Sequence, residues 1–107
     1  MFSAMLFVEE YEVEPSKLPA MLEILAEARE VIKELDLPCL KNWVTYQCKE
    51  EPKIIREVWV LEEHANVQQL DDAFMAHPRG KTIPPRFMAL LIENSYANKN
   101  YDELISL

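Results

Sequence analysis

The chain has 107 residues, half of them hydrophobic, and its 19 acidic and 11 basic side chains give a formal net charge of -8. This length predicts one domain spanning residues 1–107, because so short a chain cannot build two cores of normal size. The excess negative charge repels a phosphate backbone, which excludes nucleic acid as a partner class. No apolar run approaches the roughly 20 residues that cross a bilayer, so we expect no membrane span.

The numbers and positions of glycine and cysteine indicate which folds and which cellular compartment to expect. Gly80 is the only glycine, whereas a glycine-rich phosphate loop needs several, so nucleotide-cofactor folds are disfavoured. Cys39 and Cys48 flank one predicted strand and lie too far apart for a disulfide, which favours reduced thiols and a cytoplasmic protein. The N-terminal run MFSAMLFVEE has no Lys or Arg before its apolar part and two glutamates after it. It predicts a strand, not a signal peptide.

The first third of the chain predicts a strand followed by a long helix. Residues 4–13 are apolar at first and then alternate, as in a strand with one more exposed end. Ser16 is a suitable N-cap for a helix over about residues 17–36, with Pro19 in its first turn. Its apolar face recurs at three- and four-residue spacing and comprises Leu18, Met21, Leu22, Leu25, Ala28, Ile32 and Leu35.

A hairpin follows the helix. Residues 40–49 and 54–63 are rich in β-branched and aromatic side chains and are separated by a short turn. A four-residue turn would place Val44 opposite Trp59, whereas a turn one residue longer or shorter would exchange the two faces of the hairpin. The sequence leaves this register open.

The second half predicts a helix, a loop, another short helix and a final strand. Asn66 is a suitable N-cap for the first of these helices. The predicted bounds are a helix up to residues 77–78, a loop at 79–85, a helix at 86–94 and a strand at 99–107.

The element order β-α-β-β-α-β predicts an α+β domain with the ferredoxin-like split pattern. In this fold, a four-stranded antiparallel sheet carries helices on one face. The hairpin supplies apolar side chains such as Trp43, Tyr46 and Val58 to both faces of that sheet, so its other face also needs a cover. A second copy of the chain is the simplest cover, and we predict a homodimer.

A residue pattern around Trp59 adds a family resemblance. A strand ending in Glu57-Val58-Trp59, followed by a helix with Leu70 and Phe74 that closes at AHP, resembles the antibiotic biosynthesis monooxygenase (ABM-like) domains of the dimeric α+β barrel superfamily. As element order and length, the resemblance covers nearly all of the chain. It implies a homodimer whose sheets face each other in a barrel, and ligand cavities between sheet and helices. The activities it implies include cofactor-independent oxygenation of polycyclic quinols or anthrones.

Haem-degrading members of the superfamily combine an Asn, a Trp and a helical His. Asn42, Trp59 and His77 are present here, but Asn42 falls on the second predicted strand where that pattern has its Asn on the first. The other two residues do not match its positions either, so we do not transfer the triad. Ala73 occupies a position that often holds a helical His in ABM-like domains, which counts against their usual oxygenase chemistry.

Several aromatic side chains are candidates for binding a flat ligand. Trp59 could stack on a planar aromatic molecule, because an indole offers a large flat face and one N–H donor. The alternative, which we favour, is that Trp59 packs the junction between the sheet and the second helix. The other candidate ligand-binding residues are Trp43, Tyr46, Tyr11 and Asn42.

His64 and His77 are the only histidines, so any histidine acid–base or metal chemistry must use one of them. Their spacing matches no metal-binding motif, and no metal site is predicted. His64 fits a solvated loop. His77 precedes a proline at a helix C-terminus, where it can interact with the helix dipole, and it is the better catalytic candidate of the two.

Glu9 and Glu57 fall on predicted neighbouring strands. Buried together, they would raise each other's pKa and could supply a general base, which makes Glu57 our second catalytic candidate. The alternative is a cross-strand ion pair with Arg56, which we favour because isolated buried carboxylates are rare. Cys48 has no neighbouring histidine in sequence, so it is a weak candidate for a nucleophile.

Two functions are therefore compared. The first is a monooxygenase that acts on a small aromatic or quinone-like compound and needs no bound cofactor. The second is a non-catalytic dimeric ligand-binding or stress-response module of the same fold. An open pocket beside Trp59, Tyr46 or Tyr11 favours the first function, and a filled interface between sheet and helices favours the second.

Overall fold

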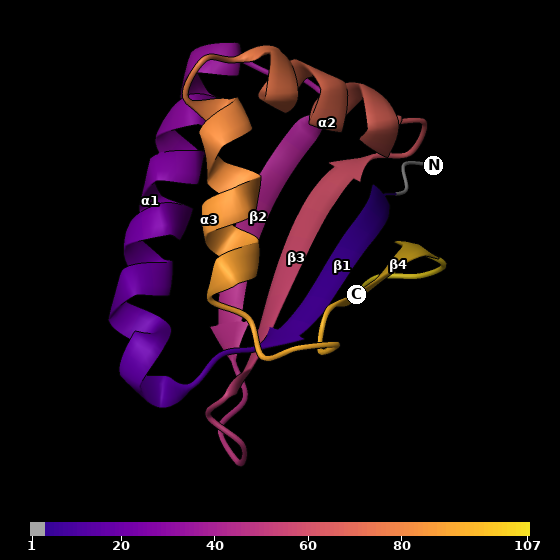
Figure 1. Cartoon of the computed structure of the whole chain (residues 1–107). Helices are drawn as coiled ribbons and strands as arrows, with labels where there is room; N and C mark the ends of the chain where they lie inside the picture. The colour runs from indigo at the N-terminus through magenta and orange to yellow at the C-terminus, as the bar shows by residue number, and fades with distance from the viewer. Residues whose placement is uncertain (1–3) are drawn as a thin grey trace.

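The computed structural model describes residues 4–107. One antiparallel sheet has the strand order β2-β3-β1-β4, and three helices lie on one of its faces (Figure 1). The strands are β1 (Ala4–Glu12), β2 (Leu40–Gln47), β3 (Ile54–Glu62) and β4 (Ala97–Asp102), and the helices are α1 (Leu18–Leu35), α2 (Val67–Ala76) and α3 (Ile83–Ala89). The predicted ferredoxin-like α+β fold is confirmed, with α3 as an addition to the basic pattern.

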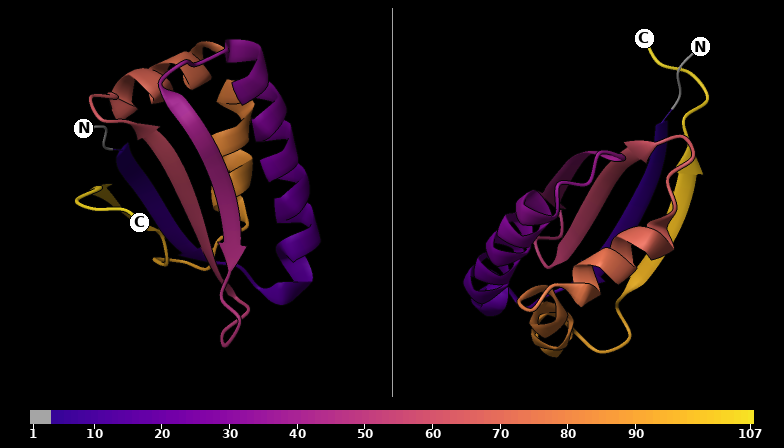
Figure 2. Two further views of the ribbon diagram at one scale, coloured as in Figure 1. Left: turned by 180° about the vertical axis from the view of Figure 1, so that it is seen from behind. Right: turned by 90° about the horizontal axis from the view of Figure 1, so that it is seen from above.

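The helices do not all run the same way over the sheet. α1 and α3 run alongside the strands, while α2 crosses over one end of the sheet (Figure 1). Seen from behind, the sheet has no helix in front of it (Figure 2). The three helices therefore cover one face of the sheet only. No helix within residues 4–107 is long and apolar enough to cross a membrane.

The start of α1 differs from the prediction. Ser16 does not cap the helix, because it lies within a 3-10 turn formed by Pro15–Lys17, and the N-cap position of α1 is Lys17. The fixed φ of Pro15 suits the first position of such a turn, so the chain enters α1 through tight helical geometry. Pro19 does lie in the first turn of α1. The cap of α2 is confirmed, since the side chain of Asn66 accepts bonds from the backbone N–H groups of Gln68 and Gln69.

The C-terminal elements begin earlier than predicted. α3 starts at Ile83, inside the predicted loop, because Pro84 and Pro85 fit a first helical turn where no N–H donor is needed. β4 spans Ala97–Asp102, so the predicted strand at 99–107 is wrong in both bounds. Over this range β4 pairs with β1, from Met5 opposite Asp102 to Glu10 opposite Ala97.

The hairpin register also differs from the one that a four-residue turn would give. Trp43 pairs with Trp59, and Val44 pairs with Val58. The shift of one residue places both tryptophans on the same face of the sheet, because side chains alternate along a strand. That face is the one the helices cover.

The core lies between α1, α3 and the sheet. Its fully buried side chains include Tyr11 of β1, Met21 and Val31 of α1, and Ile55 of β3. Leu22, predicted as part of the apolar face of α1, is 49% exposed. Helix α1 is therefore rotated so that the line from Met21 through Leu25 and Ala28 faces inward.

The opposite face of the sheet carries a stripe of apolar side chains, which we call the outer sheet face. Alternation places Leu6, Val8, Val44, Val58 and Val60 there, and all five are only partly buried. Tyr46, at the edge of the stripe, is 53% exposed. Among residues 4–107 nothing covers this stripe.

Candidate functional site

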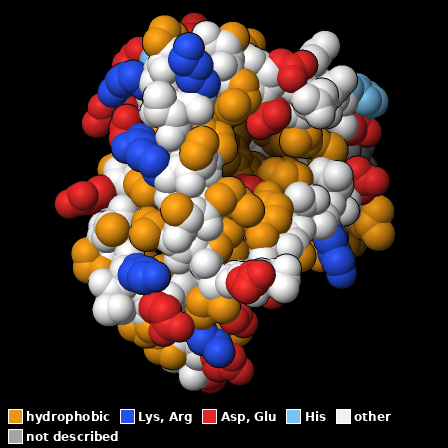
Figure 3. Space-filling view, in the orientation of Figure 1, with side chains coloured by type: hydrophobic (Ala, Val, Ile, Leu, Met, Phe, Trp, Pro, Cys, Tyr) orange, Lys and Arg blue, Asp and Glu red, His pale blue; other side chains and the backbone are white. Residues whose placement is uncertain are grey.

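A cavity of about 290 Å³ lies between the sheet and the three helices. Figure 3 shows a hollow in this face of the molecule, framed largely by hydrophobic side chains. Its volume is at the small end of the roughly 300–1,000 Å³ that is typical of ligand pockets. The sheet lines it with Phe7, Glu9, Trp43, Glu57, Trp59 and Leu61, the helices with Leu25, Ala28, Ile32, Val67, Leu70, Asp71, Phe74, Ile83, Pro84, Phe87 and Met88, and the segment before β4 with Tyr96.

Two rows of side chains cross the sheet beneath the cavity. Strand pairing aligns Trp43, Trp59 and Phe7 in one row across β2, β3 and β1. Two residues along the strands, the next row on the same face contains Thr45, Glu57 and Glu9. The floor of the cavity therefore has an aromatic half and a polar half.

The aromatic half is built as a stack. The rings of Trp43 and Trp59 are parallel within 10°, with 4.0 Å between their centroids. The guanidinium carbon of Arg29 lies 3.9 Å from the ring centroid of Trp43. Because Trp59 occupies one face of Trp43, Arg29 covers the other, and the cation strengthens the stack by a cation–π contact. Trp59 is thereby held at the wall of the cavity.

In the polar half, Glu57 is only 1% exposed, and both of its carboxylate oxygens accept hydrogen bonds. Tyr11 donates to its Oε2 at 2.6 Å, while the indole N–H of Trp43 at 2.8 Å and the hydroxyl of Thr45 donate to its Oε1. Arg29 in turn donates to the Thr45 hydroxyl at 2.9 Å. A buried carboxylate is costly without such partners, so these donors hold Glu57 in place.

Glu9 lies directly opposite Glu57 on the neighbouring strand. The indole N–H of Trp59 donates to its Oε1 at 2.7 Å, and the hydroxyl of Tyr96 donates to its Oε2. Burial raises the pKa of the Glu9 carboxyl; the bonds from Tyr96 and Trp59 act against this, and the charges of Glu57 and Asp71 add to the rise. Glu9 thus places a carboxyl group with a raised pKa at the wall of a largely apolar cavity.

The structure brings some of the sequence candidates together and separates others. Trp59, Trp43 and Glu57 all line the cavity. Tyr11 lies beneath it, fully buried, and reaches Glu57. Tyr46 and Asn42 lie on the outer sheet face, on the side away from the cavity; the Asn42 side chain accepts a bond from the backbone N–H of Trp43.

One favoured interpretation is wrong. Arg56 does not pair with Glu9 or Glu57 but forms its ion pair with Glu10, at 2.5 Å on the outer sheet face. Alternation along β1 explains this, since Glu9 and Glu10 point to opposite faces. The position of Glu9 between Phe7 and Tyr11 on the apolar face of β1 was the sequence signal that could have singled it out. Tyr96 had no such signal, because it follows a loop.

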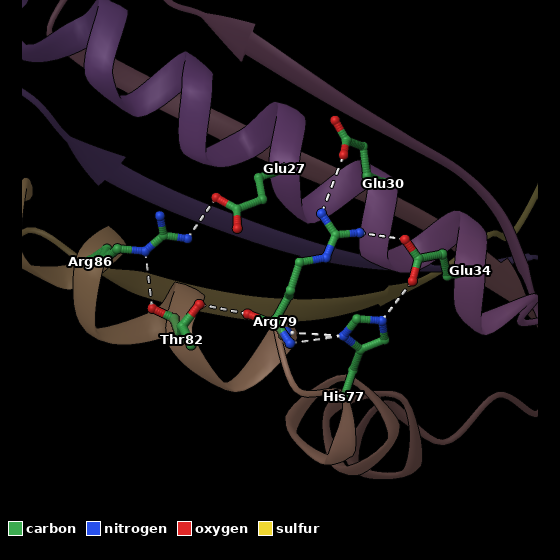
Figure 4. A network of polar contacts seen from close by, with 8 residues as sticks. Glu27, Glu30, Glu34, His77, Arg79, Thr82 and Arg86 are labelled. Atoms are coloured by element: carbon green, nitrogen blue, oxygen red, sulfur yellow. Dashed lines mark hydrogen bonds and ion pairs between the residues drawn. The ribbon is translucent and has the colours of Figure 1, made fainter.

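His77 does not line the cavity and instead ties the helices together (Figure 4). Its Nδ1 accepts the backbone N–H groups of Arg79 and Gly80, so the ring proton sits on Nε2 and is donated to Glu34 of α1 at 2.9 Å. The bond from His77, with help from Arg79, lowers the pKa of the Glu34 carboxyl. This contact joins the end of α2 to α1.

Further ion pairs extend this connection along α1. Arg79 also pairs with Glu30, and Arg86 of α3 pairs with Glu27 at 2.7 Å (Figure 4). Individual exposed pairs contribute little to stability. Together they link α1 to the loop after α2 and to α3, the helices that enclose the cavity.

The arrangement supports binding and proton transfer. A carboxyl group with a raised pKa in a cavity is a candidate for acid–base chemistry, and in this cavity Glu9 is such a group. His64 lies in a loop with its side chain almost fully exposed. Among residues 4–107, no group of three or more His, Cys, Asp or Glu side chains could hold a metal ion.

Replacing Tyr11 by Phe tests the bond network under the cavity. Tyr11→Phe removes a buried donor to Glu57, and we expect the free energy of unfolding to fall by about 1.5–3 kcal/mol, as for a hydrogen bond to a charged group. Urea denaturation measures this change. Tyr46→Phe removes an exposed hydroxyl and should stay within about 0.5 kcal/mol of wild type. Equal effects of the two substitutions would contradict the network.

The raised pKa of Glu9 predicts a pH dependence of stability. The folded chain holds this proton more tightly than the unfolded chain, so the contribution of Glu9 is fully present below its ordinary pKa of 4.5 and is lost as pH rises through the raised value. Glu9→Gln cannot ionise. We therefore expect the unfolding free energy of wild type, relative to Glu9→Gln, to fall with rising pH in that range. Urea titrations of both proteins at a series of pH values measure it, with Glu10→Gln as the control on the other face. Parallel profiles for wild type and Glu9→Gln would rule the shift out.

Comparison with known proteins shows which solved structures have a similar fold. No protein-family model matches the sequence, and no curated protein matches it. Solved structures do match over nearly the whole chain. A conserved protein from Methanosarcina mazei Go1 is 19% identical with a TM-score of 0.72, covering 94% of this chain and 92% of its own.

Two further matches carry functional descriptions. A candidate antibiotic biosynthesis monooxygenase from Bordetella bronchiseptica is 11% identical with a TM-score of 0.72, covering 96% of this chain and 99% of its own. A variant of SnoaB, a cofactor-independent oxygenase from Streptomyces nogalater, is 12% identical with a TM-score of 0.72, covering 97% and 96%. At these identities the likeness concerns the fold. The chain has the α+β fold found in structures of antibiotic biosynthesis monooxygenases.

Proposed function

We propose that this protein binds a small aromatic or quinone-like molecule between its sheet and helices and oxygenates it without a bound cofactor. The observation that carries the proposal is the Glu9 carboxyl, with its raised pKa, at the wall of a cavity lined by aromatic side chains. A base with a raised pKa is suited to removing a proton from a weakly acidic substrate near neutral pH. SnoaB, which has the same fold, is described as a cofactor-independent oxygenase, and this supports the proposal.

In this proposal, Glu9 takes the proton and the substrate supplies the electrons. Removing a proton from a quinol hydroxyl or from the CH2 group of an anthrone leaves an electron-rich anion that dioxygen can oxidise. For an anthrone, the CH2 group becomes a carbonyl: one oxygen atom of O2 enters the carbonyl, and the other leaves as water with the two hydrogens. The four electrons lost by the carbon are the four gained by O2. The apolar walls around Glu9 keep bulk water from competing for its proton.

The environment of Glu9 fits a base that does not need a histidine. Ala73, at the position of the helical His in the resembling domains, carries no acid–base group. Glu9 is held by Trp59 and Tyr96, each of which uses one carboxylate oxygen. A carboxylate oxygen has two lone pairs, so each retains capacity to accept a substrate proton.

The same two bonds favour a second candidate function. Because both oxygens of Glu9 already have donors, the carboxylate also fits a purely structural role in a non-catalytic module that binds a ligand. The cavity would then serve recognition only. Oxygen consumption separates the two functions.

Oxygen uptake with a panel of quinols and anthrones tests the catalytic function. We expect uptake above the rate in buffer, and a decrease of about 100-fold to 10,000-fold in Glu9→Gln, which is the usual contribution of a general base. Glu10→Gln, one residue along β1 on the other face, should retain the wild-type rate. His77→Ala serves as a second comparison, because His77 is the histidine candidate and lies outside the cavity lining.

No uptake with any member of the panel would favour the non-catalytic function. Uptake that survives in Glu9→Gln and disappears in His77→Ala would transfer the role of base to His77.

We also propose that the outer sheet face is the contact between two copies of the chain. Val8, Val44 and Val58 lie near its centre and are partly exposed, while the ion pair of Arg56 and Glu10 lies at its side. Partly exposed apolar side chains gathered on one face are typical of a protein contact. Pairing of two such faces would bury both stripes.

Analytical ultracentrifugation tests the dimer. We expect a dimer at micromolar concentration, and a monomer for Val58→Lys, because a buried lysine without a partner opposes association. Circular dichroism should show that Val58→Lys keeps its secondary structure. Lys99, also on the outer sheet face but exposed and near its edge, offers the control Lys99→Gln, which should remain dimeric. A monomeric wild type would contradict this contact.

A further inference from the structure

The charges around the cavity are all of one sign. Glu9, Glu57 and Asp71 line it, and no Lys, Arg or His among residues 4–107 does so. Glu9 and Glu57 lie on the sheet, and Asp71 lies on α2 across from them. The remaining lining is apolar or aromatic. The ionisable carboxyl groups among the lining residues can therefore contribute only negative charge.

The positive charge of Arg29 does not neutralise all three carboxylates. Arg29 lies over the face of Trp43 and donates a hydrogen bond to Thr45, which in turn donates to Glu57. Of the three carboxylates, Glu57 is therefore the one that Arg29 reaches through hydrogen bonds. Among residues 4–107, neither Glu9 nor Asp71 has an ion-pair partner. The side of the cavity between β1 and α2 is thus an uncompensated acidic region.

The aromatic walls act in the same direction as the carboxylates. The faces of aromatic rings carry partial negative charge and attract cations. One face of Trp59 is covered by Trp43, while Phe7, Phe74 and Tyr96 also line the space beside it. A cation on a ligand in this cavity would be attracted by the carboxylates and by the ring faces, whereas an anion would be repelled by both.

We propose that the natural ligand is an aromatic amine: a molecule of one or two rings that lies against Trp59 and carries a protonated amino group toward Asp71. Anionic molecules such as aromatic carboxylates and phosphates are excluded from the same cavity. The inference rests on the proposed function only in taking this cavity as the place where a small aromatic molecule binds. It assigns Asp71 a role in specificity and leaves Glu9 free to exchange a proton with the ring substituents.

Asp71 has a matched neighbour for comparison. Both Asp71 and Asp72 are exposed residues of α2, but Asp72 accepts a bond from Gln68 and does not line the cavity. Asp71→Asn and Asp72→Asn therefore make the same change in net charge and helix composition. Only the first changes the cavity.

Three probes of similar shape and different charge test the proposal: 1-naphthylmethylamine, 1-naphthylmethanol and 1-naphthoic acid. Isothermal titration calorimetry near neutral pH measures the Kd of each for the full chain. We expect the amine to bind at least about tenfold more tightly than the alcohol, and the acid to show no measurable binding. Asp71→Asn should reduce the preference for the amine by about threefold or more, and Asp72→Asn should leave it unchanged. Added salt should weaken the preference, because Asp71 is exposed to screening.

Binding of the alcohol as tightly as the amine, or measurable binding of the acid, would overturn the inference and leave the proposed oxygenase function standing. An equal loss of preference in both Asp variants would remove Asp71 from the specificity role. If none of the three probes binds, the inference is overturned, and oxygen uptake with quinols and anthrones still reports separately on the proposed function.

Discussion

The placement of two neighbouring carboxylates beneath the helices, one buried and one partly buried, is the constraint on which the rest of this structure depends. Glu9 and Glu57 face each other across β1 and β3 on the side of the sheet that the helices cover. A buried carboxylate is stable only when donors surround it. Both tryptophans of the chain supply their indole N–H groups for this purpose, each reaching one strand across to a carboxylate in the neighbouring row. The polar requirement therefore fixes the orientation of the largest aromatic side chains.

The same two tryptophans also shape the cavity. Trp43 and Trp59 stack on each other, and both line the space below α2 and α3. The helices above are connected at their ends by the hydrogen bond from His77 to Glu34 and by the ion pair between Arg79 and Glu34. Hydrogen-bonded tryptophans below and connected helices above favour a preformed cavity, and preorganisation would serve the binding and proton transfer proposed for it.

Sequence reasoning located the elements well where the local signal was strong. The periodicity of α1 and the Asn66 cap of α2 are local properties, and both predictions hold within a residue or two. Errors arose where local signals compete. Pro84 and Pro85 suit either a loop or a first helical turn, and packing of Ile83 into the core decides for the turn. β4 ends at Asp102, although alternation in the sequence continues.

By itself, the sequence determined the fold class, the approximate bounds of its helices and strands, and the excess of acidic over basic groups, because these depend on local pattern and composition. Only the tertiary structure decided the site. A shift of one residue in the hairpin register put Trp43 and Trp59 on one face, and alternation along β1 separated Glu9 from Glu10. The hydroxyl of Tyr96 reaches Glu9 from 87 residues away in the chain. Contacts of that range are set by strand pairing and burial, which local periodicity does not encode.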